Sequence, residues 1–302
     1  MKPLHPASSA GLADRYAVLG HPVAHSQSPF IHAEFARLTG QHLAYGRIDC
    51  PLDGFEAAVH SFIAGANAAA GLGPARGCNI TVPFKFQVLA LARRASARAL
   101  LAQAANVLRF DDDGWFADNT DGTGLVRDLQ QQAGLPLAGT RVLLIGAGGA
   151  AAGVLGPLIE AGCAAITVAN RSADKADSLV QRHAAWGQHH GVQLAASGLG
   201  RCGEAYDLVI NSSASSLAGA AVPVADAVLK PGCLAVDLMY GAAAQPFLDW
   251  AAAHGASGRD GLGMLVEQAA GAFALWRGVM PQTPPVLAAL RARLLQLARL
   301  AP

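Results

Sequence analysis

The sequence is poor in charged residues. Only 14% of its 302 residues are Asp, Glu, Lys or Arg and 52% are apolar, whereas an ordinary soluble domain is about 25% charged. This composition argues against a disordered chain and indicates a well-buried globular protein. The formal net charge of +1 gives no electrostatic reason to bind nucleic acid or an anionic membrane. The expected partner is therefore a small molecule.

Cysteine is also scarce and forms no motif. The five cysteines are Cys50, Cys78, Cys163, Cys202 and Cys233, and no two make a CxxC pair. An odd, scattered set does not suit a disulfide framework, and it lacks the spacing of a zinc site. We expect buried thiols in a reducing compartment and no metal.

Targeting and membrane-spanning segments are not expected either. The first ten residues contain two prolines and lack the apolar core of a signal peptide. Residues 142–159 carry no charge, but five of them are glycine and one is Pro157. A spanning helix there is unfavourable, and the expected location is cytoplasmic.

The first part of the chain alternates short apolar runs with helical patterns. Strands are predicted at residues 16–19 and 78–82, and a helix at residues 30–38, with Ser28 as its cap and Pro29 in its first turn. Residues 107–116, centred on Asp111-Asp112-Asp113-Gly114, have the pattern of a hairpin. The alternation predicts an α/β layer structure with a mainly parallel sheet.

A second α/β series begins near Arg141. Its predicted elements are strands at residues 142–145, 166–169, 208–210 and 234–236 and a helix at 150–160, and two helices interrupted at 281–285 end the chain. Two similar halves joined by helices predict a ligand cleft between them.

A glycine-rich turn joins the first strand of this second series to its helix. The turn consists of Gly146, Ala147, Gly148, Gly149, Ala150 and Ala151. The first glycine permits a tight turn, the second lets the backbone approach a pyrophosphate, and the small final residue allows close packing of helix on strand. The free N–H groups of the helix N-terminus would bind the phosphates. This context predicts a dinucleotide site, the alternative being a structural loop.

The residues after the next strand indicate which dinucleotide binds. An NAD site places Asp or Glu there to bind the ribose 2′-hydroxyl, but here the strand ends in Asn170-Arg171-Ser172, followed by Asp174 and Lys175. A guanidinium can bind a 2′-phosphate, which an acidic residue would repel. The cofactor is predicted to be NADP(H), unless Arg171 is an ordinary solvated side chain.

Four further segments place polar side chains at element ends: residues 20–29, 77–85, 118–122 and 260–268. In this order around the glycine turn, they make the chain resemble the shikimate dehydrogenase family over residues 16–281. The resemblance implies reversible reduction of 3-dehydroshikimate to shikimate with NADPH, a step of chorismate and aromatic amino-acid synthesis. It also implies an α/β substrate domain (1–121 and 261–302, including the returning C-terminal helices) and a Rossmann-like NADP domain (122–260).

The resemblance also assigns residues. Lys85 and Asp121 match the catalytic acid–base pair, since a lysine withdrawn from water can exchange a proton near neutral pH. The matches to substrate-binding positions are Ser26, Ser28, Thr81, Asn106, Asp121, Tyr240 and Gln268. The matches to cofactor-binding positions are Gly146, Ala147, Gly148, Gly149, Ala150, Asn170, Arg171, Ser172, Lys175, Leu238 and Gly261. Taken alone, Lys85 could be a surface lysine and Ser28 a simple helix cap.

Several positions depart from the family pattern. Gly-Ala-x-Asn-Thr has become Gln103-Ala104-Ala105-Asn106-Val107, the preceding helix carries Arg93, Arg94 and Arg98 where acidic residues are common, and Asn-Ala-Thr-x-x-Gly reads Asn211-Ser212-Ser213-Ala214-Ser215-Ser216. The departures leave Lys85, Asp121 and the serine pair in place. His21, His25 and His32 lack carboxylates or an HxxxH spacing and are expected to be structural. Trp250 and Trp276 are expected in the core.

Three other functions stay open at this point. One is a quinate/shikimate dehydrogenase with relaxed specificity. Another is a non-catalytic NADP(H)- or ligand-sensing homologue, which would not need both Lys85 and Asp121. The third is a Rossmann enzyme for an unrelated substrate, which leaves Ser26, Ser28 and Gln268 unexplained. The sequence does not decide the oligomeric state, and a homodimer is left open.

Overall fold

The computed structural model describes residues 12–65, 72–213 and 222–300. By its internal contacts the chain forms two compact units, Met1–Thr120 with Val266–Pro302 (unit 1) and Asp121–Leu265 (unit 2). The expectation about the first ten residues lies outside the described ranges. Within those ranges, no helix is long and apolar enough to cross a membrane.

Unit 1 is built on a six-stranded mixed sheet with strand order β2-β1-β3-β5-β6-β4. Its strands are β1 (Ala13–Gly20), β2 (Leu43–Asp49), β3 (Leu72–Ile80), β4 (Arg94–Ala95), β5 (Val107–Arg109) and β6 (Phe116–Asp118). β1 pairs parallel with β2 and β3, and β4 pairs parallel with β6. The predicted hairpin forms β5 and β6, which pair antiparallel, and β5 also pairs antiparallel with β3. Among the described strands, three of the five pairs in this sheet are parallel, so the expected mainly parallel sheet is confirmed, and the hairpin supplies the two antiparallel pairs.

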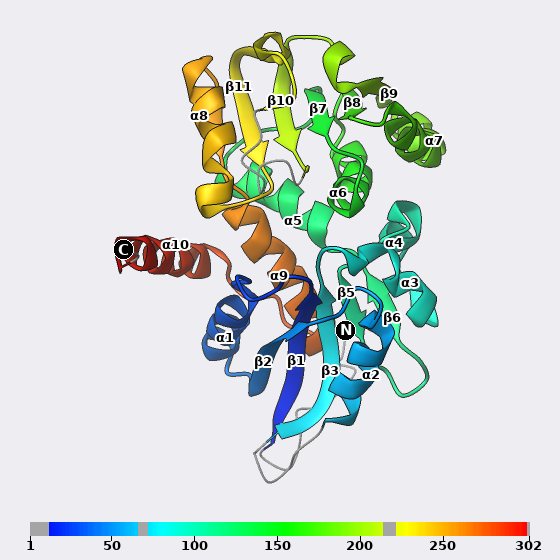
Figure 1. Cartoon of the computed structure of the whole chain (residues 1–302), viewed down its shortest axis with the longest axis vertical. Coiled ribbons are helices and arrows are strands. Elements are labelled where there is room, and N and C mark those ends of the chain that lie inside the picture. Colours follow the sequence, from blue (N-terminus) through cyan, green and yellow to red (C-terminus); the bar gives the residue numbers. More distant parts are fainter. Residues whose placement is uncertain (1–11, 66–71, 214–221, 301–302) are drawn as a thin grey trace. The chain divides into compact units, whose positions relative to one another are not determined.

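Helices cover the strands of unit 1. They are α1 (Ser28–Thr39), α2 (Phe55–Ala64), α3 (Val88–Leu91), α4 (Ala97–Ala102), α9 (Leu262–Arg277) and α10 (Pro284–Leu300), of which α9 begins in unit 2. Figure 1 shows α1 along β2 and α2 along β3. Proline lacks the N–H that the first turn of a helix leaves unbonded. Pro284 and Pro285 therefore start α10, instead of lying in the predicted break.

The buried strand β1 shows how the core of unit 1 is filled. Alternate side chains of a strand point to opposite faces of the sheet. Ala17 and Leu19 pack into one cluster, whereas Tyr16 packs into another with Trp276. All eight residues of β1 are buried, as expected of a central strand with both faces covered. The predicted core position of Trp276 is confirmed, with 3% of its surface exposed.

Unit 2 is built on a six-stranded sheet with strand order β12-β11-β10-β7-β8-β9. Its strands are β7 (Arg141–Ile145), β8 (Ala165–Asn170), β9 (Gln193–Gly198), β10 (Tyr206–Asn211), β11 (Leu229–Asp237) and β12 (Ser257–Arg259). All adjacent pairs run parallel. Read from β9, the order is 3-2-1-4-5-6, the order of the Rossmann fold. This order confirms the predicted α/β fold with a Rossmann-like half.

The helices of unit 2 are α5 (Asp121–Arg127), α6 (Gly149–Glu160), α7 (Ala173–His190) and α8 (Gln245–Ala253). A π-helical turn, Asp128–Gln132, continues α5. α7 lies along β8 and β9, and α8 lies along β11 and β12 (Figure 1). The predicted strands at 142–145, 166–169, 208–210 and 234–236 and the helix at 150–160 are confirmed.

Two local predictions in unit 1 are wrong. Ser28 is the first residue of α1 rather than its cap, and Ser26 Oγ accepts the hydrogen bond from the Ser28 N–H instead. Strand β3 ends at Ile80 and not at residue 82. The Phe84 N–H already donates to the Thr81 carbonyl at 3.1 Å, so the chain turns there.

Candidate active site

The serine pair lies in the loop between β1 and α1. Ser26 Oγ donates to Ser28 Oγ at 3.2 Å, and Ser28 is 5% exposed. Because Ser26 satisfies the first turn of α1, Ser28 is free of the capping role that the sequence suggested. The two hydroxyls are thus held together at the start of one helix, as a binding role requires.

The segment with Thr81 and Lys85 lies next to this loop. β1 and β3 are parallel neighbours, so their carboxyl ends reach the same edge of the sheet. The Thr81 N–H donates to the Leu19 carbonyl and the His21 N–H donates to the Val82 carbonyl, both at 2.9 Å. Lys85 is half-buried in the single 3-10 turn Phe84–Phe86. The sheet therefore brings Thr81 and Lys85 to the edge that carries Ser26 and Ser28.

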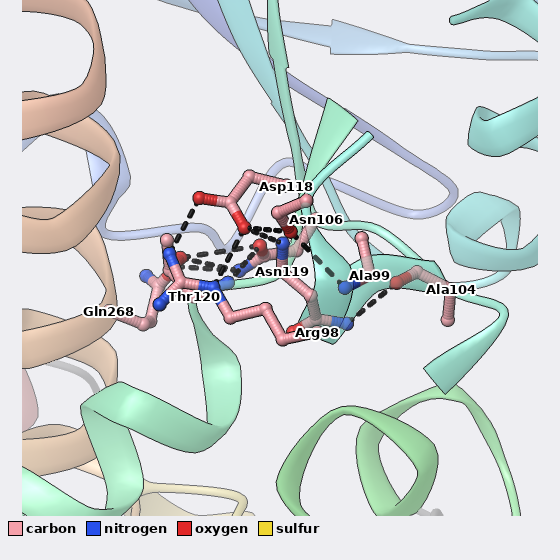
Figure 2. A network of polar contacts seen from close by, with 9 residues as sticks. Arg98, Ala99, Ala104, Asn106, Asp118, Asn119, Thr120 and Gln268 are labelled. Atoms are coloured by element: carbon pink, nitrogen blue, oxygen red, sulfur yellow. Dashed lines mark hydrogen bonds and ion pairs between the residues drawn. The ribbon is translucent and has the colours of Figure 1, made fainter. Parts of the chain in front are cut away.

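Asn106 is the centre of a buried polar network (Figure 2). Its Nδ2 donates to Thr120 Oγ1 at 3.0 Å and to Gln268 Oε1 at 3.1 Å, and its Oδ1 accepts the Thr120 N–H at 2.8 Å. Asn106 is 2% exposed and Thr120 is fully buried. The Ala105 N–H donates to the Lys85 carbonyl at 2.9 Å, which ties the network to the lysine turn. The structure thus joins Lys85, Asn106 and Gln268 from three separate segments.

Asp118 anchors the far side of this network. Arg98 binds its carboxylate through Nε at 2.7 Å and Nη2 at 2.6 Å, and Ser96 Oγ donates to it at 2.6 Å. Asp118 also accepts the Asn119 N–H, and the Asn119 side chain donates to the Ala104 carbonyl. Figure 2 shows Arg98 of α4 close to Asp118 of β6. A charge-assisted, bidentate pair of this kind fixes the loop that carries Asn106.

The arginines that departed from the family pattern are explained by local pairing. Arg98 binds Asp118, and Arg94 binds Asp111 and Asp113 at 3.2 Å and 2.8 Å. Arg93 donates to the Asp113 carbonyl. The arginines therefore bind the acidic turn of the hairpin and Asp118, the last residue of β6.

The glycine turn of unit 2 joins β7 to α6 as predicted. Gly146 has φ 112°, and a Cβ there would lie 2.6 Å from Ser212 Oγ. Ser212, which replaces the usual alanine, donates its hydroxyl to the Ile145 carbonyl at 2.7 Å. Ala214, Ser215 and Ser216 lie outside the described residues. Gly146 is therefore required by the chain's own backbone.

Gly148 differs from Gly146. It caps α6 in an extended conformation that any residue can adopt, and a Cβ there would meet no protein atom within 4 Å. Neither the backbone nor packing within the unit requires glycine at this position. A side chain there would stand in the way of a ligand at the N-terminus of α6, so glycine at this position fits a dinucleotide pyrophosphate.

The segment expected to meet the 2′-phosphate follows β8. Asn170 Nδ2 donates to the Ser172 carbonyl at 3.0 Å, which closes the turn before α7. Arg171, Ser172 and Lys175 are exposed. Arg171 forms no ion pair with any residue that the structure describes. Cations without acidic partners at this strand end fit the phosphate of NADP(H).

Leu238, Tyr240 and Gly261 gather at the end of β11. The Leu238 N–H donates to the Asn211 carbonyl at 2.9 Å, and the Gly261 N–H donates to the Met239 carbonyl at 2.8 Å. Arg259 holds the adjoining strand end through Asp128, with Nε–Oδ2 at 2.8 Å. Asp121, 4% exposed, is the first residue of α5 and directly follows Thr120. The backbone of unit 2 therefore brings Leu238 and Gly261 together at the end of β11.

Other titratable groups are buried away from the candidate substrate-binding and cofactor-binding residues. His32 is fully buried and stacks on Tyr45 with ring centroids 4.2 Å apart, and burial lowers the pKa of His32 to about 3. All five cysteines are buried and free, as expected, and burial raises the pKa of each thiol, that of Cys233 to about 11. Among the described residues, no group of three His, Cys, Asp or Glu side chains could hold a metal ion.

Several residues of the site were missed by the motif reading. Thr120 lies within residues 118–122, but its hydroxyl was not assigned although it bonds Asn106. Tyr45 Oη donates to Asn79 Oδ1 at 2.6 Å, and Arg47 Nε donates to the Ser26 carbonyl at 2.9 Å. Tyr45 and Arg47 belong to β2, where no motif signalled them. Their spacing of two on a strand that neighbours β1 was the only available signal.

Together the two sites define a class of protein. Unit 2 has the Rossmann strand order with a glycine turn at a helix N-terminus, and unit 1 holds buried amides, hydroxyls and a lysine. These are the features of a dinucleotide-binding α/β protein with a separate unit for a small polar ligand.

Comparison with known proteins identifies the family. Three family models match: the shikimate dehydrogenase substrate binding domain at residues 18–108, shikimate / quinate 5-dehydrogenase at 128–237 and the shikimate 5′-dehydrogenase C-terminal domain at 261–291. A protein of Methylibium petroleiphilum named shikimate dehydrogenase (NADP(+)) is 64% identical over 285 residues, 94% of this chain and 96% of that protein. The chain belongs to the shikimate dehydrogenase family.

Two solved structures are also similar over most of the chain. An Ael1 enzyme from Pseudomonas putida is 43% identical with a TM-score of 0.80, covering 92% of this chain and 98% of its own. Shikimate 5-dehydrogenase from Thermus thermophilus, solved with NADP(H) and shikimate, is 30% identical with a TM-score of 0.74. The match covers 92% of this chain and 99% of that protein. The predicted family and fold are confirmed.

Proposed function

We propose that this protein catalyses the reversible, NADP(H)-dependent reduction of 3-dehydroshikimate to shikimate. The observation that carries the proposal is the buried network in which Asn106 bonds both Thr120 and Gln268. Amide and hydroxyl groups held in fixed positions suit a ligand with several hydroxyl groups, which can exchange hydrogen bonds with them. The name of the 64% identical relative describes an enzyme acting on shikimate with NADP(+).

The residues are assigned roles that follow from their chemistry. The Lys85 ammonium donates a proton to the ketone oxygen as the alkoxide develops, and in the reverse direction the lysine takes that proton back. Asp121 orients Lys85 and accepts a hydrogen bond from a ring hydroxyl. Ser26 and Ser28 bind the carboxylate. Further hydroxyl contacts come from Thr81, Asn106, Gln268 and Tyr240.

The bound cofactor supplies the hydride that reaches the ketone carbon. The N–H groups at the start of α6 bind its pyrophosphate, through the turn formed by Gly146, Ala147, Gly148, Gly149 and Ala150. Asn170, Arg171, Ser172 and Lys175 form the 2′-phosphate site, and Leu238 and Gly261 border the nicotinamide. Unit 1 is then the substrate-binding catalytic domain and unit 2 the NADP domain, with limits near residues 121 and 261.

Steady-state assays with shikimate and quinate, each with NADP+ and NAD+, test this proposal. We expect NADPH formation with shikimate and NADP+ as the fastest of the four reactions. Faster turnover of quinate would favour the relaxed-specificity alternative, which the names of the relatives do not favour. NADPH binding without any shikimate turnover would favour the sensing alternative and overturn the proposed reaction.

We also propose a cytoplasmic location and a part in chorismate and aromatic amino-acid synthesis. Both follow from the proposed reaction, which uses a cytoplasmic cofactor pool and a hydroxylated cyclic acid. Deletion of the gene should then make growth depend on added aromatic amino acids. Light scattering of the purified protein would decide whether it is a homodimer.

A further inference from the structure

Two polar side chains of β2 have no role in the function proposed above, and one of them, Arg47, contacts the serine loop. Tyr45 and Arg47 are two residues apart, and β2 runs parallel to β1 with Gly20 opposite Asp49. Both strands therefore lead toward the same edge, where the loop after β1 carries Ser26 and Ser28. β2 is thus the neighbouring strand from which side chains can reach that loop.

Arg47 is bound to the loop by a forked contact. Its Nε and Nη2 donate to the Ser26 carbonyl at 2.9 Å and 2.5 Å. A guanidinium has five N–H donors, so this contact leaves three of them for another acceptor. The planar group is thereby oriented on the residue whose hydroxyl touches Ser28 at 3.2 Å.

The charge of Arg47 is not neutralised by the described part of the chain. Arg47 forms no ion pair there. The nearest acid along its strand is Asp49, whose carboxylate lies 3.3 Å from His21 Nδ1. Ser26 and Ser28 are neutral, and a carboxylate leaving water needs charge-assisted hydrogen bonds to offset its desolvation. A serine pair next to an unneutralised guanidinium meets that need.

Tyr45, two residues before Arg47 on β2, adds no charge near the loop. Its hydroxyl donates to Asn79 Oδ1 at 2.6 Å. Burial holds the pKa of Tyr45 well above its ordinary value, so the phenol stays neutral. Arg47 is therefore the cation on β2 that contacts the loop.

We propose that Arg47 is the charged group that recognises the substrate carboxylate at Ser26 and Ser28. It thereby selects a ring that bears a carboxylate over a neutral ring of the same shape. This inference rests on the proposed function, in which the serine pair binds the carboxylate. Because the three free N–H donors remain on the guanidinium, Arg47 acts both on the loop and on the ligand.

The test compares shikimate with its methyl ester, which is neutral but keeps the ring. Arg47→Gln keeps one donor for the Ser26 carbonyl and removes the charge. We expect kcat/KM for shikimate to fall about tenfold, as when a charged hydrogen-bond partner is lost at a partly exposed site. The value for the ester should change less than about twofold, and the rise of the shikimate KM with salt should disappear. Arg47→Lys should restore part of the preference for shikimate.

Arg37→Gln is the matched control, since Arg37 is an exposed arginine of α1 paired with Glu34. Arg37→Gln should leave the ratio of kcat/KM for shikimate to kcat/KM for the methyl ester unchanged. An equal fall for both substrates in Arg47→Gln would show that Arg47 only positions the loop, and no fall would exclude any role; either result overturns the inference. If the unmodified protein does not oxidise shikimate, the proposed function fails and the inference fails with it. If it does, only the inference is at stake.

Discussion

The substrate site of unit 1 and the cofactor site of unit 2 are built by different means. In unit 1, side chains such as Asn106 and Asp118 are buried and hydrogen-bonded to other side chains of the same unit, namely Gln268 and Arg98. In unit 2, the proposed pyrophosphate site consists of backbone N–H groups at the start of α6, and Arg171 is an exposed cation. Phosphates are recognised by charge and by free N–H groups, whereas ring hydroxyls need amides in fixed positions.

This difference has an energetic reason. A buried amide or carboxylate without partners costs about 1–3 kcal/mol or more. The unit 1 network avoids that cost because Thr120, Gln268 and Arg98 satisfy Asn106 and Asp118. The exposed turn of unit 2 carries no such cost, because water can satisfy its N–H groups when no ligand is bound. Substitutions should therefore act differently in the two sites.

The largest effect is expected for Lys85→Ala in unit 1. Removing a general acid should lower kcat by about 10²–10⁴, with a modest change in KM because the proton moves in the transition state. The measurement is a steady-state assay with shikimate and NADP+. Lys230→Ala is the matched control, since Lys230 is an exposed lysine of unit 2 paired with Asp207. An unchanged kcat for Lys85→Ala would remove Lys85 from the mechanism.

Two glycines of the unit 2 turn separate stability from binding. Gly146→Ala should lower the free energy of unfolding by about 1–3 kcal/mol, because φ 112° is strained for alanine and Ser212 blocks the Cβ. Gly148→Ala should leave stability within about 0.5 kcal/mol and raise the Kd of NADPH about ten- to hundredfold. Thermal melts and fluorescence titrations measure both quantities. Normal NADPH affinity in Gly148→Ala would contradict the placement of the pyrophosphate.

Acid should destabilise the protein through its buried histidines. Burial lowers the pKa of His32 to about 3 from an ordinary value of 6.5, so the unfolded chain binds the extra proton first as the pH falls. Stability should therefore drop by about 2 kcal/mol between pH 7 and pH 5 on account of His32. His32→Phe, measured by denaturant melts at both pH values, should flatten this dependence. His183 in unit 2, whose pKa burial also lowers, should contribute with the same sign.

The exposed cation of unit 2 should have a smaller effect. Arg171→Gln is expected to raise the Kd of NADP+ about tenfold, the range for one charged hydrogen-bond partner at an exposed site. The Kd of NAD+ should hardly change, because it has no 2′-phosphate. Isothermal titration calorimetry with each cofactor gives the ratio of the Kd of NAD+ to the Kd of NADP+. An equal loss of affinity for NADP+ and NAD+ would mean that Arg171 shapes the turn and does not bind the 2′-phosphate.

The smallest effect is expected at two strained positions, one in each unit. Among the described residues, Gln103 in unit 1 and Ala205 in unit 2 are the non-glycine residues with positive φ, at 53° and 61°. Gln103→Gly and Ala205→Gly should each stabilise the protein by about 1 kcal/mol, because glycine adopts this conformation without strain. Denaturant melts measure the gain. Gly134→Ala, at φ 67° with no neighbour near a new Cβ, should shift stability by a similar amount in the opposite direction.

Local patterns predicted the elements of both units well, and their details less well. The apolar run at 142–145 could only be a buried strand, and the acidic turn Asp111 to Gly114 marked the β5–β6 hairpin. The predicted cap of α1 was wrong because Ser26 and Ser28 both carry a hydroxyl near the start of the helix. Only the path of the loop decides which hydroxyl accepts a hydrogen bond from a backbone N–H of the first turn. The place of the hairpin between β3 and β4 was not predicted, because the order of distant strands in a sheet leaves no local signal.

By itself, the sequence determined the strand, glycine turn and helix that begin the Rossmann-like half. It also predicted NADP(H) through Arg171, and the motif residues Lys85, Asp121 and Ser26. These depend on neighbours within a few residues, where glycine, charge and hydroxyl groups have direct consequences for the backbone. Only the tertiary structure decided that Gln268 bonds Asn106, 162 residues away, and that Arg47 binds the Ser26 carbonyl. Such contacts depend on the order of strands in the sheet and on the C-terminal helix α9, most of which packs in unit 1. These features bring together side chains that share no local pattern.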